Sequence, residues 1–145
     1  MVAVVVTVAQ QKGGAGKTTL VAQLAAALAA GRRVAVLDID PQGSLTRWHA
    51  ARKTALKAAA AGLTFADTAG WRLGAELERL KHGHDVVLID SPPHAETEAR
   101  LALRASDLVL VPLQPSPLDL WATRPTLDLA AAEKREARVV LNRAP

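Results

Sequence analysis

The sequence predicts an α/β fold in which a mostly parallel, twisted sheet carries helices on both faces. Short apolar runs rich in valine and isoleucine alternate along the chain with longer segments that repeat leucine or alanine at helical spacing. A continuously apolar, β-branched run is typical of a strand buried on both faces, as in a parallel sheet. Because strands alternate with helices, we expect right-handed βαβ units. The chain of 145 residues has the length of one domain with a single core.

The predicted strands are short and mostly apolar. The clearest is Asp85–Asp90, an apolar run between two aspartates. Pro112 is expected to end another strand, because proline cannot donate a hydrogen bond to a sheet. The predicted strands are residues 2–9, 33–39, 63–66, 85–90, 108–111 and 138–141.

The predicted helices carry their own start and stop signals. Leucine recurs at every fourth position of the first helix, and Gly31 suits the position after its end. Ser44 can cap the second helix, because its hydroxyl can accept a hydrogen bond from a first-turn amide. Pro125 is expected to kink or restart the last helix, where it removes a backbone donor. The predicted helices are residues 17–30, 44–60, 73–82, 95–105 and 118–136.

Composition excludes several classes of protein. The chain has no cysteine, which excludes disulfides, zinc–thiolate sites and iron–sulfur clusters. The formal net charge of +4 permits a polyanionic partner but fits an ordinary basic surface equally well. The apolar run Val2–Ala9 is too short for a signal peptide, and no stretch reaches the ~20 apolar residues of a membrane span. We therefore expect a cytoplasmic protein without a membrane partner.

A glycine-rich loop joins the first predicted strand to the first predicted helix. Its glycines let backbone amides approach phosphate oxygens, and the helix N-terminus favours the same anions. Lys17 is expected to contact the β- and γ-phosphates of a nucleotide, and the Thr18 hydroxyl to bind Mg²⁺. Gln11 stands where the common phosphate-loop pattern has its first glycine, and a second lysine follows it. The residues of this loop and of the helix start are Lys12, Gly13, Gly14, Ala15, Gly16, Lys17, Thr18 and Thr19.

Three aspartates lie at predicted strand ends, at the sheet edge where α/β proteins bind ligands. Asp38 and Asp40 end the second strand, and Asp90 ends the strand that begins at residue 85. Beside a phosphate site, Asp90 is expected to hold the magnesium that Thr18 binds, directly or through water. The other two can hold magnesium waters or orient an attacking water. For each aspartate alone, a turn residue without a ligand is the alternative.

Together, these segments resemble the ParA/MinD family of deviant Walker A P-loop ATPases. Residues 111–120 are also similar to a stretch of the small ParA-type plasmid and chromosome partition proteins, and the resemblance runs from Val2 to about Asn142. It implies a three-layer P-loop NTPase fold, ATP/ADP and Mg²⁺ as cofactors, and slow ATP hydrolysis that a partner stimulates. Iron–sulfur members and tyrosine kinases of similar fold fit less well, because the chain lacks cysteine and tyrosine. MinD-type members carry a membrane-binding C-terminal helix, whereas residues 138–145 suggest a strand.

The resemblance also implies roles for individual residues. Lys12 is expected to cross an ATP-sandwich homodimer and contact the partner's phosphates, whereas the loop alone equally allows it to serve its own nucleotide. Asp40 is expected to orient the hydrolytic water, and Asp38 to support magnesium waters. Asn142 and Arg143 lie where family members often contact adenine.

The resulting hypothesis is a ParA-like ATPase whose ATP-bound dimer binds DNA nonspecifically. With a ParB-like adaptor it would segregate or position a plasmid, a chromosome or another cargo, in the bacterial or archaeal cytoplasm and on the nucleoid when it binds DNA. Family members usually continue beyond the position of Asn142, so residues 1–145 are expected to be a single domain that is short or truncated. Pro145 can also lie against the base.

Two alternatives stay open for the function. One is a nucleotide-binding regulator with little turnover, and the other is a MinD-like positioning ATPase. Arg100 and Arg104 lie on one face of a predicted helix. They can contact DNA phosphates or a partner, or form a solvated face beside neighbouring glutamates.

Overall fold

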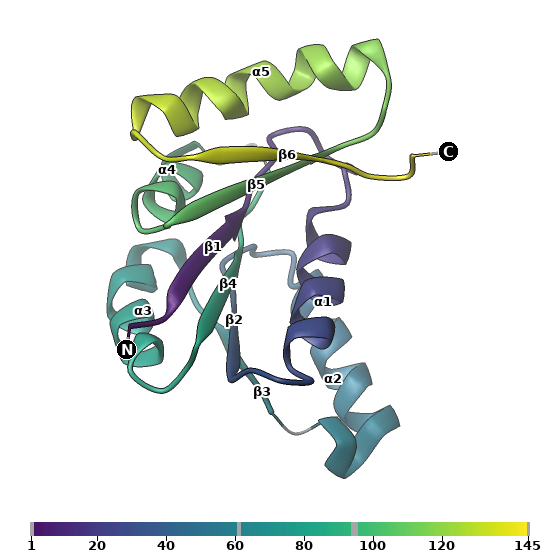
Figure 1. Cartoon of the computed structure of the whole chain (residues 1–145), viewed down its shortest axis with the longest axis vertical. Helices are drawn as coiled ribbons and strands as arrows, with labels where there is room; N and C mark the ends of the chain where they lie inside the picture. The colour runs from purple at the N-terminus through teal and green to yellow at the C-terminus, as the bar shows by residue number, and fades with distance from the viewer. Residues whose placement is uncertain (1, 61, 94–95, 145) are drawn as a thin grey trace.

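The structure is a computed structural model that describes residues 2–60, 62–93 and 96–144. It contains one six-stranded sheet flanked by helices, which confirms the predicted α/β class (Figure 1). None of the helices in these ranges has the length and hydrophobicity of a membrane span. The strands are β1 (Val4–Val8), β2 (Val34–Asp38), β3 (Leu63–Asp67), β4 (Val86–Asp90), β5 (Leu108–Leu113) and β6 (Ala137–Leu141). The α-helices are α1 (Lys17–Leu28), α2 (Ser44–Leu56), α3 (Leu73–Lys81), α4 (Glu96–Arg104) and α5 (Pro117–Ala132), with 3-10 turns at Lys57–Ala60 and Gly70–Arg72.

The strands are ordered β3-β2-β4-β1-β5-β6, and every neighbouring pair is parallel. β4 lies between β1 and β2, and its register pairs Asp90 with Val8 on one side and with Asp38 on the other. Because parallel strands all end at the same edge, this register brings the two aspartates together beside the loop that follows β1.

Helices cover both faces of the sheet, as predicted. α1 and α2 lie on one face, and α3 and α4 lie on the other, where α5 continues the layer beyond α4 (Figure 1). Alternate residues of each strand point to opposite faces, so Leu88 of β4 packs in the α1 layer while Val87 and Ile89 pack in the α3 layer. The buried centre of α1 is Val21 and Ala25, and the predicted leucine row packs at its margin.

The expected ends of two helices are corrected by the structure. Gly31 does not take the left-handed conformation, and its amide instead donates to the carbonyl oxygen of Leu28 in an ordinary turn. Ser44 is not the cap of α2, because Gly43 holds that position and Ser44 is the first helical residue. A carboxylate oxygen of Asp38 accepts the first-turn amide of Thr46 at 3.3 Å, so the cap comes from the end of β2.

Two prolines do not interrupt their elements as predicted. β5 continues through Pro112, because this residue's nitrogen faces the side on which β1 has already ended, so no ladder bond is lost. α5 passes through Pro125 as one helix. The carbonyl oxygen that loses its donor there belongs to Trp121, and both residues lie on the exposed side of α5, where water can replace the bond. The predicted helix start at Ala95 lies outside the described residues.

Leu88→Ala tests the central position of β4. The Leu88 side chain is 1% exposed and lies between α1 and the middle of the sheet, so its truncation leaves a cavity. We expect the free energy of unfolding to fall by about 2–5 kcal/mol in urea titrations followed by circular dichroism. Leu118→Ala, at a side chain that is 69% exposed, is the control and should change it by less than about 0.5 kcal/mol. Equal losses in both variants would contradict the described core.

Candidate nucleotide-binding site

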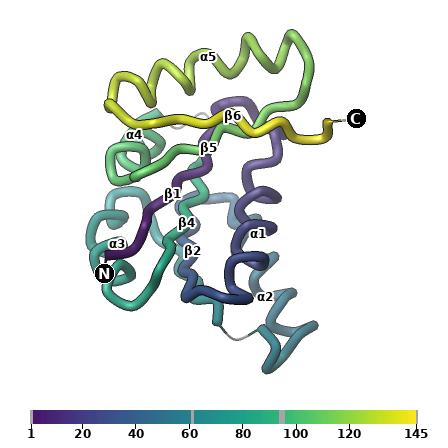
Figure 2. The backbone as a smooth tube through the Cα atoms, viewed as in Figure 1, coloured from purple at the N-terminus to yellow at the C-terminus, as the bar shows by residue number. Residues whose placement is uncertain are grey.

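The loop between β1 and α1 is built around two glycines in the left-handed conformation. Gly14 has φ 76° and Gly16 has φ 95°, values that side chains with a Cβ atom rarely adopt. At Gly16 a Cβ atom would also overlap the side-chain amide of Asn142. α1 begins immediately afterwards, and no side chain among the described residues caps it. Its first-turn amides therefore stay available for an anion. Figure 2 traces this loop past the end of β6 into α1.

A cavity of about 400 Å³ opens at this loop. It brings together most of the predicted site residues and adds three that the sequence did not single out as ligand-binding: Gln42, Ser44 and Pro93. Its size suits a small organic ligand. The predicted residues on its wall are Gly13, Gly14, Gly16, Lys17, Thr18, Thr19, Asp40 and Arg143.

Lys17 supplies a buried positive charge on this wall. The residue is only 7% exposed, and this burial lowers the pKa of its ammonium group, while the charges of Asp90 and Asp40 oppose the shift. A buried ammonium group is costly without an anionic partner. The phosphates of a nucleotide would supply that partner.

Thr18 and Asp90 form the second polar contact of the site. The Thr18 hydroxyl donates to Asp90 Oδ2 at 2.8 Å. The other carboxylate oxygen, Oδ1, is buried and accepts no hydrogen bond from any described residue. Burial raises the pKa of Asp90 to about 7, because no neighbouring charge fully compensates the carboxylate. Oxygen ligands of this kind suit Mg²⁺, which commonly takes one or two protein oxygens together with phosphate oxygens and water.

Asp38 has a structural role at the edge of this site. It is fully buried, and its oxygens accept hydrogen bonds from the Asp40 amide at 3.0 Å and from the Thr46 hydroxyl at 3.1 Å. Burial raises the pKa of Asp38 as well. Asp38 therefore holds the turn that presents Asp40 to the cavity. Its contribution to magnesium waters stays a prediction. No cluster of three His, Cys, Asp or Glu side chains suited to a metal occurs in the described ranges.

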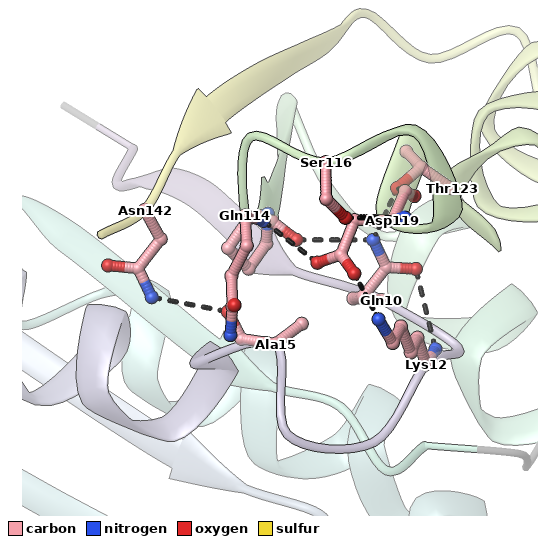
Figure 3. A network of polar contacts seen from close by, with 9 residues as sticks. Gln10, Lys12, Ala15, Gln114, Ser116, Asp119, Thr123 and Asn142 are labelled. Carbon is pink, nitrogen blue, oxygen red and sulfur yellow. Dashed lines mark hydrogen bonds and ion pairs between the residues drawn. The ribbon is translucent and has the colours of Figure 1, made fainter. Parts of the chain in front are cut away.

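Lys12, the second lysine of the loop, does not line the cavity, and its side chain points to Asp119 (Figure 3). Its ammonium group forms an ion pair with Asp119 at the start of α5. Its backbone amide donates to the buried side chain of Gln10 at 3.4 Å. The Gln10 amide group in turn donates to the Pro112 carbonyl oxygen at 3.1 Å and to the Thr123 hydroxyl at 2.8 Å. The start of the loop is thus joined to both β5 and α5.

Asn142 and Arg143 lie on the other side of the loop. The Asn142 side-chain amide donates to the carbonyl oxygen of Ala15 at 3.2 Å, so this residue holds the loop itself (Figure 3). Arg143 has φ 55° and lines the cavity. Contact of either residue with adenine stays a prediction, and Pro145 lies outside the described residues.

The sequence-based prediction missed the residues that join the start of the loop to α5. Gln10 and Asp119 were not assigned to the site, and neither were the buried hydroxyls of Thr123 and Thr126, which both bond Gln10. The sequence does contain a pattern that indicates this network. Asp119, Thr123 and Thr126 recur at the spacing of one helix face. A polar row on a face that must pack inward indicates a buried hydrogen-bond network.

The parallel sheet, the glycine-rich loop and the cavity at the start of α1 define a P-loop nucleotide-binding fold. A profile of the CobQ/CobB/MinD/ParA nucleotide binding domain matches residues 6–143. The chain therefore belongs to this family, as the resemblance predicted.

Three relatives illustrate the range of the family. The chain is 41% identical over 143 residues to "Maintenance of carboxysome distribution protein A" of Gloeobacter kilaueensis, which covers 96% of this chain and 62% of that protein. It is 30% identical to "Sporulation initiation inhibitor protein Soj" of Bacillus subtilis, over 76% of this chain and 58% of that protein. Cobyrinic acid a,c-diamide synthase of Mycobacterium smegmatis, solved with an ATP analogue and magnesium, superposes with a TM-score of 0.76 at 29% identity, covering 95% of this chain and 72% of that one. The chain spans about three-fifths of the length of the two curated relatives.

Asp90→Asn tests the buried carboxylate. Burial raises the folded-state pKa to about 7, above the ordinary value of 3.8, so the folded protein keeps a proton that the unfolded chain releases. In protein free of nucleotide and magnesium, the contribution of Asp90 to stability should therefore fall as pH rises from 5 to 7, by at most about 1.4 kcal/mol per pH unit. Urea titrations at several pH values should give a flatter profile for Asp90→Asn. Asp67→Asn, at the exposed end of β3, is the matched control and should keep the wild-type slope.

Proposed function

We propose that this chain is the nucleotide-binding part of a ParA-like ATPase that dimerises around ATP and positions a cargo on DNA. The observation that carries the proposal is the division between the two lysines of one loop. Lys17 lines the cavity, whereas Lys12 points out of it toward α5. A lysine that does not face its own nucleotide is placed to serve another, and a second copy of the chain would supply that nucleotide.

The cavity residues suggest how hydrolysis would proceed. The loop glycines and the first turn of α1 would hold the phosphates, and Lys17 would neutralise their charge. Thr18 and Asp90 would hold magnesium, which when bound withdraws charge from the phosphate oxygens. Asp40, on the cavity wall, would orient the attacking water and accept its proton. The ammonium group of Lys12 from the partner subunit would neutralise further negative charge on the terminal phosphate.

The proposals for the cargo and for DNA binding rest on the relatives and on the charge of the chain. The relatives are named for carboxysome distribution and for the inhibition of sporulation initiation, so a protein assembly is as suitable a cargo as a plasmid or chromosome. A net charge of +4 is compatible with nonspecific DNA binding. Arg100 and Arg104 are poor candidates for that contact, because both pair with Glu133, at 3.2 and 2.9 Å, and join α4 to α5. A ParB-like adaptor would connect the dimer to its cargo.

Three substitutions separate the steps of this mechanism. With ATP and magnesium, light scattering should show the mass of wild type double. Asp40→Ala should still dimerise but release phosphate about 100-fold more slowly, because the water-orienting carboxylate is lost. Lys12→Ala should bind ATP and stay monomeric, and Lys17→Ala should lose ATP binding. If wild type and Asp40→Ala both bind ATP and neither dimerises, the sandwich mechanism is wrong.

DNA and lipid then discriminate among the remaining functions. Steady-state phosphate release by wild type should rise when DNA is added, with Lys17→Ala as the inactive control. ATP binding without turnover under any of these conditions would favour the nucleotide-dependent regulator. ATP-dependent pelleting with anionic liposomes would favour a MinD-like protein.

A further inference from the structure

The ion pair between Lys12 and Asp119 links the nucleotide loop to the first turn of α5 (Figure 3). The Lys12 side chain is 40% exposed, whereas that of Asp119 is 7% exposed. The Lys12 side chain is therefore freer to move than the Asp119 side chain. The lysine side chain is long and partly exposed, whereas the short carboxylate side chain is almost enclosed.

Asp119 is also fixed by its own backbone surroundings. One of its carboxylate oxygens accepts the Gln114 amide at 3.0 Å, and its amide donates to the Ser116 hydroxyl at 3.1 Å. Ser116 is the cap of α5, so the carboxylate lies in the helix's first turn, where an anion is favoured. The Lys12 ammonium, followed by the Gln114 amide, holds the pKa of Asp119 below its usual range. The charged form of Asp119 is thus favoured, and its carboxylate is held in a fixed place.

We propose that Asp119 is a positioning residue that holds Lys12 against its own subunit and so restrains nucleotide-dependent dimerisation. The inference rests on the proposed function, in which Lys12 must reach phosphates bound by a second copy. Its ammonium group must then leave Asp119, and the phosphate charge must replace the carboxylate. ATP carries one more phosphate than ADP and competes better for the lysine. The ion pair therefore helps the protein to dimerise with ATP and not with ADP.

The restraint can be tested on the nucleotide-free protein, without any dimer. The rate of Lys12 acetylation by an amine-reactive ester, followed by peptide mass spectrometry, reports how free the ammonium group is. Asp119→Asn keeps an oxygen for the Gln114 amide but removes the charge, and should raise the rate about fivefold, the effect of removing a partly exposed ion pair. Ser116→Ala removes the helix cap without touching Lys12 and should leave the rate unchanged. An unchanged rate in Asp119→Asn, or an equal rise in Ser116→Ala, overturns the proposal.

A measurement on wild type covers the case in which Asp119→Asn does not fold. Raising the salt concentration from about 0.05 to 0.5 M screens a partly exposed pair. Acetylation of Lys12 should then accelerate relative to that of Lys53, an exposed lysine of α2. A constant ratio of the two rates overturns the proposal.

Dimerisation distinguishes failure of the restraint from failure of the proposed function. Asp119→Asn should dimerise at about fivefold lower protein concentration with ATP than wild type, and should also dimerise with ADP. Ser116→Ala should behave as wild type. Weaker dimerisation of Asp119→Asn would show that Asp119 orients Lys12 and does not restrain it, which overturns the inference alone. If no variant dimerises with ATP, the proposed function fails, whatever the acetylation rates show.

Discussion

The parallel register of β4 with β1 and β2 is the constraint on which the candidate site depends. It sets Asp90 beside Val8, where the loop begins, and beside Asp38, where the turn to α2 begins. A slip of one residue would turn every side chain of β4 to the opposite face of the sheet. Leu88 and Ile89 pack in different layers of the core, so such a slip would exchange side chains of different shape between two closely packed layers. The apolar packing that stabilises the sheet therefore also places the carboxylates.

The site keeps charges that the protein alone does not satisfy. Lys17 and Asp90 are both almost completely buried. Burial lowers the pKa of Lys17 and raises that of Asp90, so it favours the neutral form of each group. One carboxylate oxygen of Asp90 accepts no hydrogen bond from the described residues. A bound phosphate and a bound cation would relieve both groups at once. The folded protein thus already carries the desolvation cost of these two groups before a ligand binds. Because the ligands bind the folded state, they should raise the free energy of unfolding by mass action.

Much of this architecture follows from local patterns. Continuous apolar runs predicted the strands, and the glycine and lysine spacing predicted the phosphate loop. Two of the errors, at Ser44 and Pro112, share a physical cause, because each outcome depends on another strand of the sheet. Ser44 has the chemistry of a cap, but the carboxylate of Asp38 takes that task from the neighbouring strand. Pro112 is tolerated only because β1 ends before it. Neither outcome is visible from the residues that flank these positions.

The two lysines of the loop have different tertiary surroundings and therefore different contacts. Lys17 begins α1 and is buried among the site's carboxylates. Lys12 precedes the glycines, and its amide is held by Gln10 while its ammonium group is held by Asp119. Both of those contacts also reach α5, since Gln10 bonds Thr123. A movement of the first turns of α5 would therefore change where Lys12 lies, whereas the start of α1 is joined to central strand β4 by the hydrogen bond from Thr18 to Asp90.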